Sequence, residues 1–190
     1  MIKLENITKK YGEQIVLDNF SLNVNSGERI ALIGASGRGK TTLLHIMSGI
    51  IKADSGAVEV YGNIAVMFQE PRLLPWKNAR ENILAVLKKE KAALADKYLD
   101  AVGLSDDKDK LPTSLSGGMA QRVAFARFLA YAEATDADVL LLDEPFSALD
   151  GDTANEMIVL LDSFAAKKTL ILVTHDESHA AKLGAKVIKI

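Results

Sequence analysis

The chain has 190 residues, of which 48% are hydrophobic and 25% are charged, values typical of one compact globular domain. Its 25 acidic and 23 basic residues give a net charge of −2, so no basic field favours nucleic acid as a partner. The absence of cysteine excludes disulfides, thiolate zinc sites and iron–sulfur ligation. No apolar run reaches the roughly 18 residues of a membrane-spanning helix, and no secretory signal opens the sequence. We therefore expect a cytoplasmic chain, unless a partner holds it at a membrane.

Strands and helices alternate along most of the sequence. In chain order the patterns predict strands within residues 1–33, a helix over 41–48, strands over 58–61 and 64–68, helices within 78–103 and over 116–132, a strand over 139–142, a helix over 153–164 and a strand over 170–173. This alternation favours an α/β domain with a mainly parallel, buried sheet. The long helical block in the middle interrupts it, and we interpret that block as an inserted subdomain.

A glycine-rich turn follows the predicted buried strand that ends at residue 33. It has the sequence Gly34-Ala35-Ser36-Gly37-Arg38-Gly39-Lys40-Thr41 and leads directly into a helix. This is the pattern of a phosphate-binding loop, in which backbone N–H groups and the helix N-terminus face the phosphates. Lys40 is expected to reach the β- and γ-phosphate oxygens, and the Thr41 hydroxyl to ligate Mg²⁺. A dinucleotide fingerprint would lack the Lys-Thr pair, and an idle turn would not need it.

Two adjacent carboxylates end a second hydrophobic strand, Val139-Leu140-Leu141-Leu142. Asp143 is predicted to hold Mg²⁺, directly or through water, and Glu144 to polarise the water that attacks the γ-phosphate. Two acids after a strand could also be a solvated loop. The phosphate loop upstream favours the functional interpretation.

A second glycine-rich turn opens the longest predicted helix, with the sequence Leu115-Ser116-Gly117-Gly118-Met119-Ala120-Gln121-Arg122. Its N–H groups form a further anion-binding helix end. Lys40 and Asp143 lie 103 residues apart, whereas a direct βαβ step needs only about 30. The turn lies in this intervening block. One triphosphate in one chain rarely needs two such ends, so we predict that this one serves the nucleotide of another copy.

Together these motifs resemble the ATP-binding cassette of ABC transporters over nearly all 190 residues. LSGGMAQR resembles the family signature, which is specific when it accompanies a phosphate loop and LLLDEP. The resemblance implies the ABC-ATPase form of the P-loop NTPase fold, with antiparallel N-terminal strands, and a head-to-tail homodimer that sandwiches two ATP. It assigns catalysis to Glu144, His175, Gln69 and Lys40, Mg²⁺ to Thr41, Gln69 and Asp143, adenine stacking to Tyr11, ATP contacts to the loop through Thr42, and contacts across the dimer to Ser116, Gly117, Gly118 and Asp150.

The segment Phe68-Gln69-Glu70-Pro71-Arg72-Leu73-Leu74-Pro75-Trp76 points to one branch of the family. Its amino-acid sequence resembles that of the nitrate, sulfonate and taurine importer ATPases, which work with separate membrane permeases and solute-binding proteins. An exposed apolar cluster usually marks an interface, and in the family this segment faces the permease. Alternatively, Leu73, Leu74 and Trp76 simply pack beneath the helical subdomain.

The resemblance also sets the expected organisation. We expect one ABC ATPase domain over residues 1–190, with a core in 1–76 and 133–190 and a helical subdomain in 77–132. Few residues follow His175, so no C-terminal regulatory domain is expected. His45 and His179 match no motif and are interpreted as ordinary helix residues. We expect the chain to lie on the cytoplasmic face of the cell membrane, where its permease holds it.

Two other functions compete with a transport ATPase. A soluble ABC-type ATPase that acts on DNA or ribosomes usually carries tandem cassettes, coiled coils or basic arms, for which this chain has no room. A regulatory nucleotide-binding module without turnover would lack Glu144 or His175, and both are present.

Overall fold

The computed structural model describes residues 1–190, and the chain divides into two compact units. Unit 1 contains Met1–Val66, Asp138–Glu144 and Ala165–Ile190, and unit 2 contains Met67–Ala137 and Pro145–Phe164. None of the helices combines the length and the apolar character that a membrane crossing requires.

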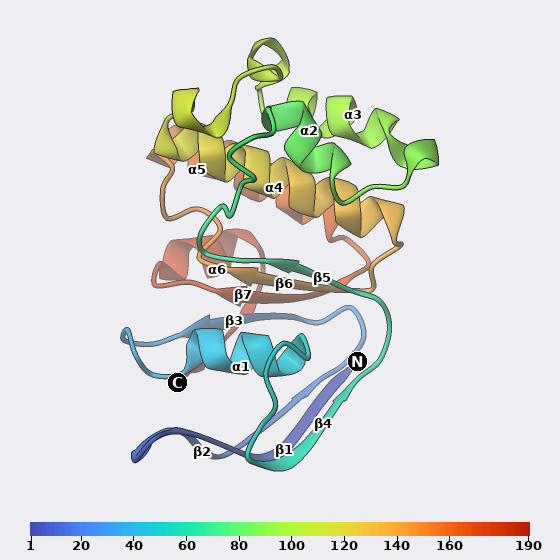
Figure 1. Ribbon diagram of the computed structural model, residues 1–190. Coiled ribbons are helices and arrows are strands. Elements are labelled where there is room, and N and C mark those ends of the chain that lie inside the picture. Colours follow the sequence, from blue (N-terminus) through green and yellow to red (C-terminus); the bar gives the residue numbers. More distant parts are fainter. The chain divides into compact units, whose positions relative to one another are not determined.

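Unit 1 is built on two sheets (Figure 1). The antiparallel sheet has the order β2–β1–β4 and consists of β1 (Ile2–Tyr11), β2 (Gln14–Val24) and β4 (Ser55–Val60). The other has the order β5–β6–β7–β3–β8 and consists of β3 (Arg29–Ile33), β5 (Ile64–Met67), β6 (Val139–Asp143), β7 (Thr169–Val173) and β8 (Lys186–Lys189). The pairs β3–β7, β3–β8 and β6–β7 are parallel. These two sheets confirm the expected fold class.

The core of unit 1 follows from the alternation of side chains along β3. Ile30 and Leu32 face the apolar cluster that includes α1 (Lys40–Met47) and the antiparallel sheet. Figure 1 shows α1 between the two sheets. Ala31 and Ile33 point to the opposite face and pack with Ala180 of α6 (Glu177–Lys182). Because both faces of β3 are covered, its residues from Ile30 to Ile33 are all apolar.

The register of the parallel strands positions the site. Leu32 of β3 and Asp143 of β6 both pair with Val173 of β7. The three strands therefore end at the same edge, and the residues that follow them emerge together, as in other open parallel sheets.

Unit 2 is helical. It contains α2 (Ala79–Leu84), α3 (Ala93–Ala101), α4 (Gly117–Ala134) and α5 (Gly151–Phe164), with short 3₁₀ turns at Lys89–Lys91, Ser105–Asp107 and Pro112–Ser114. Aromatic rings connect these helices: Tyr98 of α3 meets Phe164 of α5 edge to face, with ring centroids 6.2 Å apart. Phe125 of α4 meets Phe146 in the same way at 6.0 Å.

Candidate functional site

The glycine-rich loop connects β3 to α1 and depends on the small size of its glycines. Gly37 and Gly39 have φ angles of 81° and 89°, which side-chain-bearing residues rarely adopt. A Cβ on Gly34 would lie 2.3 Å from the carbonyl oxygen of Ile190. A Cβ on Gly39 would lie 2.9 Å from both the backbone oxygen and a methyl carbon of Val16. Val16, on β2, is thus a neighbour of the loop that the sequence did not single out.

Lys40 closes the loop on itself. It is 9% exposed, and its Nζ donates hydrogen bonds to the carbonyl oxygens of Gly34 (2.7 Å) and Ala35 (2.9 Å). Its ammonium group thus lies at the start of the loop, while residues 35–38 are exposed. An ammonium held by two neutral carbonyls can exchange them for phosphate oxygens, because hydrogen bonds to charged acceptors are the stronger ones.

Thr41 and Asp143 meet across unit 1. The Thr41 hydroxyl donates a hydrogen bond of 2.6 Å to Asp143 Oδ2, although the two residues lie far apart in sequence. Asp143 is 2% exposed, and its burial raises the pKa of the carboxyl, partly offset by the Thr41 hydrogen bond. Its other oxygen, Oδ1, is buried without any hydrogen-bond partner.

This pair fits a hard divalent cation. A hydroxyl and a carboxylate are oxygen ligands, which Mg²⁺ prefers, and Mg²⁺ usually binds one or two protein oxygens together with phosphates and water. A buried carboxylate oxygen without a partner is otherwise costly. The geometry is therefore compatible with the Mg²⁺ site expected at Thr41 and Asp143.

Glu144 and His175 form a second pair at the same sheet edge. Glu144 follows β6, has the unusual φ of 45°, and donates its backbone N–H to the carbonyl oxygen of Val173 at 2.9 Å. Its Oε2 lies 2.9 Å from His175 Nδ1. The Glu144 side chain is mostly buried, whereas 71% of the His175 side chain is exposed. Left-handed backbone at a non-glycine residue is strained and recurs at functional sites.

His179 supports the segment that carries His175. Its Nδ1 lies 3.4 Å from the Thr174 hydroxyl, and its Nε2 lies 3.4 Å from Asp176 Oδ2. Burial lowers the pKa of His179, against the opposite effect of Asp176. His179 lies in α6, as expected from the sequence, and these contacts connect that helix to the segment that carries His175. The spacing of Asp176 and His179 by three positions at the start of a helix could have indicated this contact.

Tyr11 ends β1, next to the tight turn at Gly12, whose φ is 59°. About half of its side chain is exposed, and Lys9 Nζ lies 5.7 Å from the centre of its ring. This exposure is compatible with stacking of a planar group against the ring.

The remaining expected site residues belong to unit 2. Ser116 caps α4, its Oγ accepting a hydrogen bond from the N–H of Met119 at 3.2 Å. The glycine-rich turn of LSGGMAQR is called the signature turn below. A Cβ on Gly118 would lie 3.3 Å from the carbonyl oxygen of Ala148, so the signature turn contacts the 147–150 loop closely. The Asp150 carboxylate caps α5 by accepting hydrogen bonds from the Thr153 N–H and hydroxyl, both 2.9 Å long, which lower the Asp150 pKa.

Two further residues of unit 2 bear on the signature turn and on the segment after β5. Gln121 is buried, and its Nε2 donates to the carbonyl oxygen of Pro145 at 3.0 Å, which ties α4 to the residue after Glu144. Gln69 is exposed and lies in a bend after β5. Of the apolar residues that follow, Leu73 and Leu74 are half-buried, whereas Trp76 is 71% exposed.

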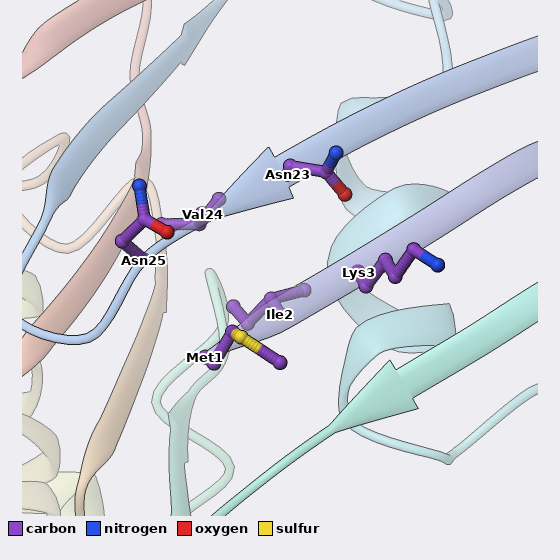
Figure 2. A pocket seen from close by; sticks show the side chains of 6 residues that line it. All are labelled: Met1, Ile2, Lys3, Asn23, Val24 and Asn25. Carbon is purple, nitrogen blue, oxygen red and sulfur yellow. The ribbon is translucent and has the colours of Figure 1, made fainter.

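A shallow cavity of about 230 Å³ lies on the antiparallel sheet, apart from these residues (Figure 2). It is lined by Met1, Ile2, Lys3, Asn23, Val24 and Asn25. Its one charged side chain, Lys3, forms an ion pair of 2.8 Å with Glu5. The cavity contains none of the expected site residues.

Comparison with known proteins identifies the family. Residues 17–147 match the family model described as ABC transporter. The chain is 44% identical to the aliphatic sulfonates import ATP-binding protein SsuB 2 of Pseudomonas syringae, an alignment that covers 98% of this chain and 68% of that protein. It is 43% identical to SsuB of Corynebacterium glutamicum, covering 96% and 76%.

Solved structures agree with this assignment. The dimeric ATP-binding cassette MJ0796, in a post-hydrolysis state bound to ADP and Pi, matches with a TM-score of 0.89 at 32% identity, covering all of this chain and 94% of the other. The loop, the strand-end acids and the signature turn thus occur together in a chain whose relatives are transporter ATPases. The chain belongs to the ABC transporter family, as one of its ATP-binding ATPase subunits.

Proposed function

We propose that the chain hydrolyses ATP to drive the import of an aliphatic sulfonate or a related organic nutrient through a separate membrane permease. The observation that carries the ATPase is the meeting of three strand ends at one edge of the parallel sheet, where Lys40, the Thr41–Asp143 pair and the Glu144–His175 pair follow β3, β6 and β7. The names of the relatives at 43–44% identity support the importer and its substrate class.

The nucleotide is proposed to bind along the loop from residue 34 to Thr42, with its adenine on Tyr11. Lys40 leaves the Gly34 and Ala35 carbonyls and binds the β- and γ-phosphates. Thr41 and Asp143 hold Mg²⁺, which neutralises charge on the phosphate oxygens when bound. Gln69 of unit 2 is proposed as a further ligand that senses Mg²⁺ and water.

Glu144 is proposed to orient the attacking water and accept its proton, while His175 contacts the γ-phosphate. The 2.9 Å contact between the two side chains fixes the direction of the carboxylate. Because phosphoryl transfer needs little covalent help from the protein, positioning and charge account for most of the rate.

A second copy of the chain is proposed to complete the site. Ser116, Gly117, Gly118 and Asp150 of one protomer would face the nucleotide of the other, since the start of α4 offers backbone N–H groups to an anion. ATP then holds the two cassettes together, and its hydrolysis releases them. The permease converts this closing and opening into transport.

The permease is proposed to dock on the segment that carries Trp76, whose exposed ring favours an interface. This places the chain peripherally on the cytoplasmic face of the membrane. An importer of this type also requires a solute-binding protein that delivers the nutrient from outside.

Transport in a reconstituted system tests the proposal. The chain is purified with the integral-membrane subunits bound to it, placed in proteoliposomes with Mg-ATP inside, and supplied with a labelled alkanesulfonate and its binding protein outside. We expect uptake that depends on ATP and stops in Glu144→Gln. Failure of any integral-membrane subunit to copurify with the chain would contradict the importer, whereas absence of hydrolysis in the complex would contradict the ATPase.

A further inference from the structure

The segment between β5 and α2 has no helix or strand, yet one buried and one half-buried side chain of unit 2 hydrogen-bond to its backbone. It comprises residues 68–78, and we call it the Trp76 segment. Its two supports are Asn82 of α2 and Arg127 of α4. Neither residue belongs to the motifs that bind nucleotide.

Asn82 is fully buried and holds the second half of the segment. Its Oδ1 accepts a hydrogen bond from the Leu74 N–H at 2.7 Å. Its Nδ2 lies within hydrogen-bonding distance of three carbonyl oxygens, those of Leu74 (3.2 Å), Lys77 (2.8 Å) and Asn78 (3.0 Å). Every polar atom of this buried amide is therefore used on the turn that carries Trp76.

Arg127 holds the first half. Its Nη2 donates to the carbonyl oxygen of Pro71 at 2.6 Å, and its Nη1 donates to that of Arg72 at 3.1 Å. Partial burial lowers the pKa of the Arg127 guanidinium, and its two hydrogen bonds to backbone carbonyls compensate for part of the lost hydration. Arg72 has a φ of 46°, and its guanidinium lies 4.4 Å from the centre of the Phe68 ring. The carbonyl groups of Pro71 and Arg72 thus both accept hydrogen bonds from the planar guanidinium of Arg127.

Arg127 connects this segment to the signature turn. It lies on α4, which begins at Gly117 and runs without interruption to Ala134. At 1.5 Å per residue, the helix places Arg127 about 15 Å from its N-terminus. One uninterrupted helix thus connects the contacts of Arg127 to the turn that is proposed to bind the γ-phosphate across the dimer.

We infer that Asn82 and Arg127 are positioning residues that make the Trp76 segment and α4 move as one body, so that the permease and the signature turn are coupled. This inference rests on the proposed docking of the permease at Trp76. It assigns the transmission between that surface and the proposed ATP-binding end of α4 to Asn82 and Arg127.

The first test uses the isolated full chain, because Trp76 is its only tryptophan. Time-resolved fluorescence anisotropy reports how freely the Trp76 segment moves. In Arg127→Met, which keeps an aliphatic stem but loses the guanidinium, we expect a larger fast component than in the wild-type chain. Arg127→Lys, which can bond one carbonyl, should be intermediate. Anisotropy equal to wild type in Arg127→Met would overturn the role of Arg127 as a positioning residue of the Trp76 segment.

Arg122→Met is the matched control. Arg122 also lies on α4, and its guanidinium donates to the carbonyl oxygens of Val102 (2.9 Å) and Gly103 (3.4 Å) instead of the Trp76 segment. Its loss removes the same kind of bond from the same helix. It should leave the mobility of Trp76 at the wild-type level.

The second test separates coupling from mere stability by comparing ATP turnover of the isolated chain with that of the reconstituted transporter. Arg127→Met should lower the ratio of the stimulated to the basal rate about five- to tenfold, the lower range of coupling between sites. Arg122→Met should keep the wild-type ratio. A looser Trp76 with full stimulation would overturn the coupling role. If no permease stimulates the ATPase rate of the wild-type chain, the importer function is refuted instead. The anisotropy result would still decide whether Arg127 fixes the Trp76 segment.

Discussion

Replacement of Asp143 by Asn isolates the energetic cost of the candidate metal site. The side chain is 2% exposed, its Oδ1 has no partner, and burial raises its pKa. An asparagine keeps the Thr41 hydrogen bond through its carbonyl oxygen but carries no charge. We therefore predict that Asp143→Asn stabilises the nucleotide-free protein while it abolishes hydrolysis.

The expected gain in the free energy of unfolding is limited, because the asparagine amide removes the charge but not the unpaired polar atom. A buried polar atom without a partner costs about 1–3 kcal/mol, and more when it is charged. The asparagine NH₂ inherits the unpaired position, so only the part due to charge is recovered, about 1–2 kcal/mol. For a chain of this length that corresponds to an increase of about 2–8 °C in melting temperature.

The assay is thermal unfolding, followed by circular dichroism in EDTA without nucleotide. Because the folded state raises the pKa of Asp143, the gain should be largest at neutral pH, shrink as pH falls through the raised folded-state pKa, and vanish only well below about 3.9, where the carboxyl is protonated in both states. Asp138→Asn at the other end of β6 is the control. Asp138 is exposed and bonds the Asn63 N–H at 2.8 Å, so its replacement should change stability by less than about 0.5 kcal/mol. A lower melting temperature for Asp143→Asn would refute the reasoning.

Two further substitutions test other parts of the site. Lys40→Ala should lose ATP binding, measured by isothermal calorimetry, since the ammonium at the start of the loop is removed; wild-type affinity would contradict its assignment. His179→Gln tests the pH dependence of stability. Since burial lowers the pKa of His179, the folded state disfavours its proton, and wild-type stability should fall as pH drops below about 6.5. Between about pH 7.5 and pH 5.5, His179→Gln should lose less stability than the wild-type protein. An equal loss of stability in both proteins would show that other groups cause it.

The sequence predicted the central strands of unit 1 because each has a local cause, whereas the bounds of α6 and β8 were not predicted. β3, β6 and β7 are continuous apolar runs bounded by polar residues, the pattern of strands covered on both faces. The loop at residues 34–41 and the acids after β6 have fixed spacing and chemistry. The ABC transporter resemblance and the fold class are confirmed, while the roles of the individual site residues remain predictions.

Other features depend on contacts between distant residues and have no local signal. The apolar stripe of α5 predicts a helix, but long-range contacts, such as that of Phe164 with Tyr98, group α5 with unit 2. Arg127 and Asn82 appear in sequence as ordinary helix residues. Their function as backbone supports becomes visible only when the Trp76 segment is seen against α2 and α4.

The central claim, that two copies share ATP, is tested most directly by the mass of Glu144→Gln in solution. Light scattering with and without Mg-ATP compares monomer and dimer in a variant that should bind ATP but hydrolyse it about 10²- to 10⁴-fold more slowly. We predict a monomer without nucleotide and a dimer with Mg-ATP. A protein that binds ATP and yet remains monomeric at every concentration would contradict the shared site.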